Sequence, residues 1–235
     1  MDFGLFKSIV DEATRYGKRS FSLHLFGEPL LYKNWFEAIQ YIKSKNKRHT
    51  VLFTTNGTLL ERFGNLDKLI ASGADQVYWS WREEAKFSEE TKKRLKKWGK
   101  FRVRIIEEVT PKEELEKWKT WGNIEYRKLH NYGGNINTDS FQTDSPVETS
   151  SLMKEEERWP CYHLWLAPAV AWNGKILICC SDPHQAEVLG QFPAVTVHEI
   201  WVGAKLKEIR DSHLRGEYGG ICKNCDVWKT FPSIF

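Results

Sequence analysis

The chain has 235 residues, enough to bury a sizeable core and to form one domain of moderate size or one domain with a smaller appendage. Its mean hydropathy is negative, and no run approaches the roughly 18 apolar residues of a membrane span, so we expect a soluble, cytoplasmic protein with no membrane partner. The net charge is only +4, and the lysine-rich stretch from Lys92 to Lys100 has tryptophan and leucine interleaved on a predicted helix, which indicates a solvated helix face and no nucleic-acid partner.

The first 130 residues alternate short β-rich runs with amphipathic helices, which predicts an α/β fold. We expect strands at five runs, namely 19–26, 49–54, 75–80, 101–107 and 123–129. Asn34, three residues before Glu37, marks one helix start, and the run from Thr110 to Glu113 is typical of a capping box with proline at the first helical position. The alternation predicts parallel strands joined by right-handed crossovers, in an open sheet or in a closed or partial barrel.

In either architecture, ligands bind at the C-terminal ends of the strands. The candidate binding residues that follow the first three strands are Gly27, Glu28, Pro29, Thr55, Asn56, Gly57 and Ser80. Taken singly, the Gly-Glu-Pro and Thr-Asn-Gly sequences are also ordinary turn chemistry. Taken together, a glycine that permits close backbone approach, a carboxylate and polar turns predict a site for a polar ligand that carries an amine and a carboxylate.

The last third of the chain differs in character from the first. Residues 135–158 are polar and nearly devoid of aromatic side chains, which predicts an exposed linker between a domain at 1–134 and a domain at 159–235. Within the second domain, two apolar runs flank Asn173-Gly174, a strong hairpin signal, and predict strands at 164–171 and 175–180. A helix over 197–214 is predicted to begin at Thr196, with Glu199 three residues later.

All five cysteines lie in this second domain, between residues 161 and 225. Cytosolic thiols stay reduced, so their clustering favours a metal or catalytic site over disulfides. A C-x2-C after a glycine turn presents two thiolates and a hairpin can present two more, which predicts one inorganic centre held by Cys161, Cys179, Cys222 and Cys225. Four thiolates suit a 4Fe-4S cluster or a structural zinc, and the spacing does not separate them. Adjacent strand residues face opposite ways, so Cys179 is the expected ligand and Cys180 is not; His163, His184 and His198 are expected to make ordinary polar contacts.

The runs LHLFGEPLL, VLFTTNGTLL and EYRKLHNYGG, followed by a cysteine-bearing tail, resemble the radical S-adenosylmethionine (SAM) enzymes that end in a SPASM domain. The resemblance extends from about residue 1 to 228 and implies a (β/α) barrel followed by a small α+β SPASM domain. It implies that Gly27, Glu28 and Pro29 contact the SAM amino group, that the turn at 55–57 lines the cofactor and substrate pocket, and that Ser80 lies near the SAM carboxylate. It also favours iron-sulfur over zinc, because C-x12-G-x4-C with a later C-x2-C fits the front half of the SPASM pattern, and it implies one auxiliary 4Fe-4S cluster.

The same family carries a C-x3-C-x2-C motif after the first barrel strand, and residues 1–235 contain no such motif. We therefore expect a partial barrel that lacks its first strand and leaves the strand at 19–26 as an unpaired edge. Three explanations remain open: a fragment of a longer enzyme, a separate chain that supplies the strand and the cluster loop, or an iron-sulfur or zinc binding protein that has lost radical chemistry. The resemblance favours an enzyme that cleaves SAM and modifies a peptide or small molecule, and it implies that this chain alone makes no 5′-deoxyadenosine.

Overall fold

The computed structural model of the protein describes residues 1–106, 109–135, 137 and 158–229. The chain divides into two compact units, one formed by Phe6–Leu129 and the other by Met1–Leu5 together with His130–Phe235. The expected linker at 135–158 lies almost entirely outside the described residues. In the described part of the chain, no helix is long and apolar enough to cross a bilayer.

The first unit, Phe6–Leu129, is built on a parallel sheet of five strands in chain order. The strands are β1 (Ser20–Ser22), β2 (Thr50–Thr55), β3 (Gln76–Ser80), β4 (Phe101–Ile106) and β5 (Ile124–Arg127). Each strand pairs with the next along the chain, the arrangement that crossovers between neighbouring parallel strands produce. The α/β class and the parallel sheet are therefore confirmed, with β1 at one end of the strand order and β5 at the other.

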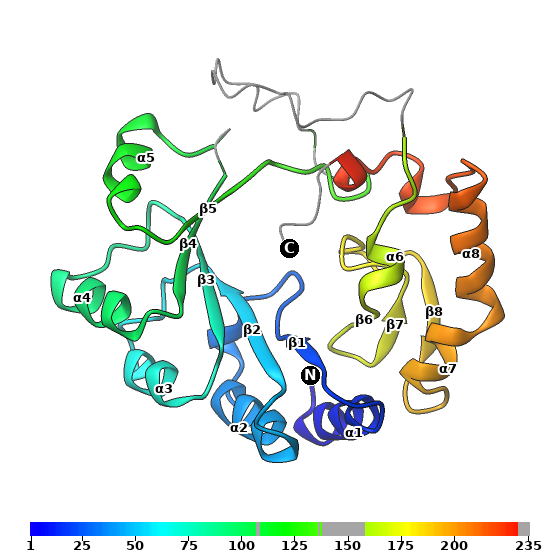
Figure 1. Ribbon diagram of the computed structural model, residues 1–235, viewed down its shortest axis with the longest axis horizontal. Coiled ribbons are helices and arrows are strands. Elements are labelled where there is room, and N and C mark those ends of the chain that lie inside the picture. The colour runs from blue at the N-terminus through cyan, green and yellow to red at the C-terminus, as the bar shows by residue number, and fades with distance from the viewer. Residues whose placement is uncertain (107–108, 136, 138–157, 230–235) are drawn as a thin grey trace. The chain divides into compact units, whose positions relative to one another are not determined.

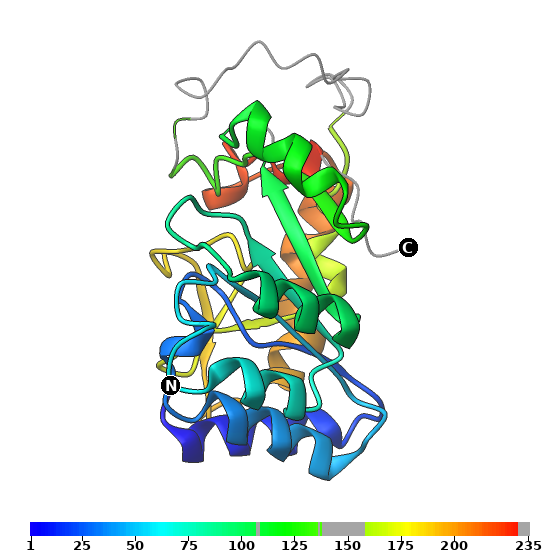
Figure 2. The ribbon, with the colours of Figure 1, turned by 90° about the vertical axis from the view of Figure 1, so that its left-hand side faces the viewer.

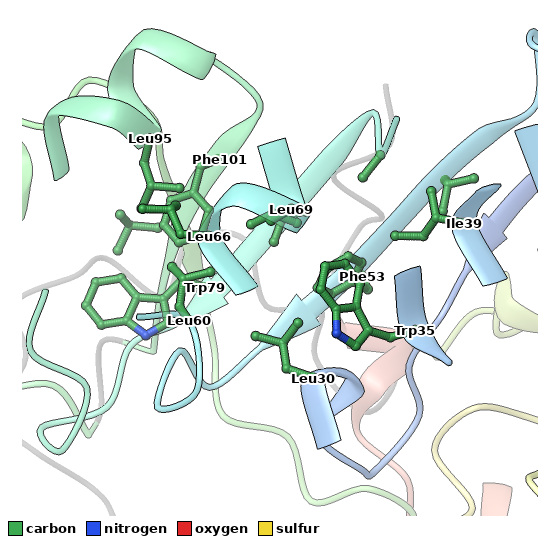
Figure 3. Packing of buried hydrophobic residues seen from close by; sticks show 14 of the residues in the cluster. Leu30, Trp35, Ile39, Phe53, Leu60, Leu66, Leu69, Trp79, Leu95 and Phe101 are labelled. Carbon is green, nitrogen blue, oxygen red and sulfur yellow. The ribbon is translucent and has the colours of Figure 1, made fainter. Parts of the chain in front are cut away.

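Helices cover one face of this sheet (Figures 1 and 2). They are α2 (Trp35–Lys45), α3 (Asn65–Ala71), α4 (Glu89–Trp98) and α5 (Lys112–Lys119), while α1 (Phe3–Thr14) precedes β1. Every second residue of β2 is buried beneath them, including Val51 and Phe53, as a half-buried strand requires. Figure 3 shows Phe53 beside Trp35 of α2 in the apolar core, to which Val51 and Ile39 also belong. The alternate positions of the strands face away from the helices.

The helix starts agree only in part with the sequence-based expectations. Asn34 is the N-cap of α2, as expected, although its side chain makes no capping hydrogen bond. The capping box expected at Thr110 is wrong, because Pro111 has extended backbone angles, takes the N-cap position itself and delays the first helical residue to Lys112. Thr110 is instead buried, and its backbone N–H donates to the carbonyl of Ile106.

The second unit carries a small antiparallel sheet of β6 (Ala169–Val170), β7 (Lys175–Leu177) and β8 (Val188–Gln191). The predicted Asn-Gly turn joins β6 to β7, with Gly174 at a φ of +85°. The segment at 164 begins as a helix, α6 (His163–Leu166), and not as a strand.

The predicted helix over 197–214 is interrupted. It forms as α7 (Val197–Val202) and α8 (Ala204–Leu214), because Gly203 has an extended backbone between them. The capping box at its start is present: Glu199 N–H donates to Thr196 Oγ1 at 3.1 Å, and Thr196 N–H donates to Glu199 Oε2 at 2.7 Å. Two 3-10 turns follow α8 within the described residues, η4 (Gly220–Cys222) and η5 (Val227–Lys229).

Candidate metal centre and cofactor turns

Four cysteines from three distant parts of the sequence line one cavity of the second unit, and they are Cys161, Cys179, Cys222 and Cys225. Cys161 lies just before α6, Cys179 follows β7, and Cys222 ends η4. A tight turn joins the last two cysteines, in which Cys225 N–H donates to the carbonyl of Cys222 at 3.3 Å. The structure thus brings together the four residues predicted from the sequence to be metal ligands.

The spacing of these thiols indicates the size of the centre they suit. Among the described residues, one compact group of potential metal ligands is found. It consists of His163, Cys179 and Cys180, whose ligand atoms all lie within 4.8 Å of one another. Tetrahedral zinc, with Zn–S bonds of about 2.3 Å, brings any two of its thiolates to about 3.8 Å. Of the four cavity cysteines only Cys179 belongs to this compact group, and a 4Fe-4S cluster, which is larger than a single ion, binds thiolates that lie farther apart.

The cysteine thiols are strongly shifted towards the neutral form. Burial, with smaller effects from neighbouring thiols, raises the pKa of Cys161 and of Cys222 to about 12. Burial also raises the pKa of Cys225, and a hydrogen bond with Cys180 followed by burial raises that of Cys179. A cationic centre that enters the cavity must therefore displace protons from these sulfurs, as metal ions do on binding thiols.

The guanidinium of Arg158 belongs to the same cavity. It donates to the carbonyl of Lys223 at 3.0 Å and to the carbonyl of Cys222, and it lies over the Tyr218 ring, 3.8 Å from the centroid. Its Nε is buried and has no hydrogen-bond partner among the described residues. A cation with an unsatisfied N–H at the wall of the cavity suits a cluster that has sulfur acceptors and carries a net negative charge once four thiolates hold it.

A neutral histidine fixes the backbone at Cys161. His213 is 2% exposed, and burial, with a smaller effect from Arg158, lowers its pKa to about 4. Its Nδ1 accepts from the Cys161 N–H at 3.3 Å. Neither Arg158 nor His213 was predicted from the sequence to belong to the site. Arg158 could have been considered because it lies three residues before Cys161, whereas nothing in the sequence around His213 on α8 connects it with the cysteines.

A clasp, formed by Asn131 and Asp226, holds the C-x2-C turn. Asn131 N–H donates to Asp226 Oδ1 at 3.0 Å, and Asp226 N–H donates to Asn131 Oδ1 at 3.2 Å. Asn131 Nδ2 also donates to the carbonyl of Asn224 at 2.6 Å. Residue 131 is thereby fixed to the turn that carries Cys222 and Cys225.

Cys179 lines the four-cysteine cavity and Cys180 lies beside it, but strand alternation is not the reason for this arrangement. Strand β7 ends at Leu177, where a register shift interrupts its pairing with β8, so the alternation of strand faces does not extend to Cys179 and Cys180. The Cys180 thiol lies near Cys179, and its Sγ is 3.8 Å from Nδ1 of His163. His163 itself lines the cysteine cavity and stacks on Tyr162 with the ring centroids 4.4 Å apart.

In the first unit, Glu28 joins the two turns that the sequence indicates for cofactor binding. Its Oε1 accepts from Thr55 Oγ1 at 2.7 Å and from the Leu30 N–H at 3.0 Å, and its Oε2 accepts from the Asn56 N–H at 2.6 Å. A carboxylate offers about four acceptor positions, so about one remains for a ligand donor. Gly27 and Pro29 flank Glu28, and Pro29 begins the short turn η1 (Pro29–Leu31).

Gly57 is required by close packing as well as by its backbone angle. Its φ is +80°, and an added Cβ would lie 2.6 Å from Trp79 Nε1 and 2.8 Å from Phe87 Cζ. The indole N–H of Trp79 donates to the carbonyl of Asn56 at 3.0 Å. The Thr-Asn-Gly turn is therefore fixed against the aromatic core, while Ser80 lies at the end of β3, paired in register with Arg104.

A polar network on the sheet face away from the helices was not predicted from the sequence. Arg104 donates to Glu125 Oε2 at 2.9 Å and to Thr54 Oγ1 at 2.8 Å, and it lies over the Tyr78 ring, 4.1 Å from the centroid. Arg127 also pairs with Glu125, at 2.6 Å. The alternation of arginine with apolar residues in FRVRII was the available signal for a charged strand face.

His24 extends this network beside the short edge strand. Its Nδ1 accepts from the Thr54 N–H at 3.1 Å. The imidazole thus takes the place of the backbone carbonyl to which Thr54 would donate if β1 continued. Burial, with a smaller effect from Arg104, lowers the His24 pKa from 6.5 to about 4. This side-chain replacement explains why β1 is shorter than the strand expected over 19–26.

Comparison with known proteins supports the iron-sulfur assignment of the second unit. Residues 161–226 match the SPASM family model, an iron-sulfur cluster-binding domain. An uncharacterized protein of Treponema pallidum (strain Nichols) is 28% identical over 75 residues, which are 32% of this chain and 20% of that protein. The matched segment thus spans about a fifth of that curated relative.

Two crystal structures of BtrN share the fold of the chain. The complex of BtrN with AdoMet and 2-DOIA has a TM-score of 0.65 at 20% identity, and BtrN in an open conformation has a TM-score of 0.62 at 19% identity. Each match covers 96% of this chain and 80% of the BtrN chain. The comparisons therefore show an iron-sulfur cluster-binding SPASM domain at residues 161–226 and the fold of BtrN across the chain.

Proposed function

We propose that the second unit holds one auxiliary 4Fe-4S cluster on Cys161, Cys179, Cys222 and Cys225. The observation that carries this proposal is that four thiols from three distant parts of the sequence line one cavity of a domain that matches an iron-sulfur cluster-binding family. Arg158 supplies a compensating positive charge and an N–H for a sulfur acceptor. When bound, such a cluster supplies electron transfer or a site that positions substrate.

In the same proposal, the first unit binds SAM at the two turns joined by Glu28. The remaining acceptor position of the Glu28 carboxylate receives the amino group, with Gly27 and Pro29 beside it. The turn at 55–57 and Ser80 line the cofactor and substrate pocket. One of the two BtrN crystal structures is a complex with AdoMet, and because this chain shares the BtrN fold, that complex supports SAM as the ligand of the proposal.

The function that follows is that of a radical SAM/SPASM iron-sulfur enzyme that cleaves SAM and modifies a peptide or small molecule. A second candidate is a non-catalytic iron-sulfur binding protein. It is favoured by one observation, that residues 1–160 contain no cysteine to hold a cluster that reduces SAM. A missing N-terminal segment or a separate chain that brings the C-x3-C-x2-C motif would restore the first candidate.

Iron and sulfide analysis after anaerobic reconstitution tests the cluster. We expect about four irons per chain in the wild type and in Cys180→Ala, and a loss of the cluster in Cys161→Ala, Cys222→Ala and Cys225→Ala. Equal iron in the wild type and in Cys222→Ala would overturn the proposal.

Two further assays separate the candidates. Calorimetric titration with SAM, compared between the wild type and Glu28→Gln, tests cofactor binding at the joined turns. A 5′-deoxyadenosine assay with and without a chain that carries the C-x3-C-x2-C motif tests catalysis: product only with the added chain supports the enzyme, and no product in either case supports the binding protein.

A further inference from the structure

We propose a second metal site, in which His163, Cys179 and Cys180 bind one zinc ion. This site shares Cys179 with the proposed cluster, so zinc and the cluster compete for the Cys179 thiolate. The zinc site itself stands on its own geometry; only the competition rests on the proposed function.

The geometry of the three ligand atoms suits a single ion. They lie within 4.8 Å of one another, and Cys180 Sγ is 3.8 Å from His163 Nδ1. Two ligands of tetrahedral zinc, with Zn–S near 2.3 Å and Zn–N near 2.0 Å, are about 3.6 Å apart. Small side-chain rotations therefore bring the three atoms into coordination distance.

The surroundings of the site fix its ligands. The stacked ring of Tyr162 orients the His163 imidazole, and the Ser181 N–H donates to Cys179 Sγ at 3.4 Å. Outer contacts of this kind hold metal ligands in position. Cys180 is exposed, so solvent can reach the ion and complete a four-coordinate shell.

The charges also balance. Zinc binds two thiolates and a neutral imidazole, so each of the two cysteines gives up its S–H proton to solvent and forms a bond from sulfur to zinc. Two thiolate charges neutralise Zn²⁺, which suits a half-buried position. No electron is transferred, because zinc has no redox chemistry.

The four-cysteine cavity is the rival position for zinc. A zinc ion there would have to draw together thiols that are spread over a wider cavity, whereas the triad of His163, Cys179 and Cys180 is already compact. The triad therefore takes zinc when no cluster is present. Once Cys179 is bound to zinc, the cluster lacks one of its four ligands, so zinc in the domain blocks cluster assembly.

Cobalt(II), a spectroscopic substitute for zinc, tests the site. The full chain is stripped of metal, kept reduced and anaerobic, and titrated with cobalt(II), followed by displacement with zinc. We expect one equivalent to bind the wild type with thiolate-to-cobalt absorption. Cys180→Ser and His163→Gln should lose this binding, and Cys222→Ser, the matched control, should keep it.

Two results would overturn the zinc site: loss of cobalt binding in Cys222→Ser with retention in Cys180→Ser, or no cobalt binding in the wild type. Iron-sulfur reconstitution of the same variants reports separately on the cluster, since Cys180→Ser should assemble it and Cys222→Ser should not. Preloading with zinc should block reconstitution in the wild type but not in Cys180→Ser. Equal assembly in both preloaded proteins would refute the competition.

Discussion

Replacing Gly57 with alanine should destabilise the first unit by about 3–5 kcal/mol. The left-handed backbone, with φ at +80°, costs a non-glycine residue about 1 kcal/mol. The new Cβ would lie 2.6 Å from the Trp79 indole, which is 1% exposed and has no room to move, and overpacking of this kind costs about 1–3 kcal/mol. Displacing the indole also breaks its hydrogen bond to Asn56, worth about 1 kcal/mol.

Gly99→Ala is the matched control. Gly99 has nearly the same φ, +75°, but an added Cβ there meets nothing within 4 Å, so only the backbone cost of about 1 kcal/mol applies. Hydrogen–deuterium exchange of peptides from β2 and β3, with urea unfolding of each variant, measures the difference. If Gly57→Ala is no less stable than Gly99→Ala, the packing of the Thr-Asn-Gly turn against Trp79 is refuted.

Three further predictions concern charged or titrating groups. Glu28→Gln should destabilise the joined turns by about 1.5–3 kcal/mol, because the amide N–H₂ of glutamine would face N–H and O–H groups that now donate to the carboxylate. Faster hydrogen exchange of the Asn56 amide would show this loss. Unchanged exchange would count against a Glu28 connection between the two turns. The pKa of His24 is about 4 in the folded protein and about 6.5 in the unfolded chain, so the unfolded chain takes up a proton first as the pH falls. The free energy of unfolding should therefore decrease by about 1–3 kcal/mol between pH 6.5 and pH 4. Urea titrations at several pH values should show a weaker pH dependence for His24→Gln. Arg158→Gln should lower the midpoint potential of a reconstituted cluster, because the lost cation favoured the more negative reduced state, and one-electron reduction should become less favourable by on the order of 1–3 kcal/mol. An unchanged potential in a redox titration would show that Arg158 does not act on the cluster.

The strands of the first unit were predictable because their apolar residues alternate, and alternation of this kind arises when one face is covered by helices. The cysteine set was predictable because thiols are scarce in the chain and their spacing is distinctive. The position of Cys180 was not predictable, since it depends on a register shift between β7 and β8 that the residues themselves do not indicate. The length of β1 was missed for a similar reason: a side chain, His24, takes over the backbone donor of Thr54.

The clasp between Asn131 and Asp226 joins residues 95 positions apart, and all five cysteines lie between them. The cysteine-bearing part of the chain is therefore a ring closed by hydrogen bonds, whose two ends meet beside the last cysteine. In a closed ring, doubling the length of a flexible stretch costs only about 0.6 kcal/mol of closure entropy. A change in the length of the ring should therefore cost the clasp little, whereas loss of the hydrogen bonds between Asn131 and Asp226 would open the ring beside Cys225.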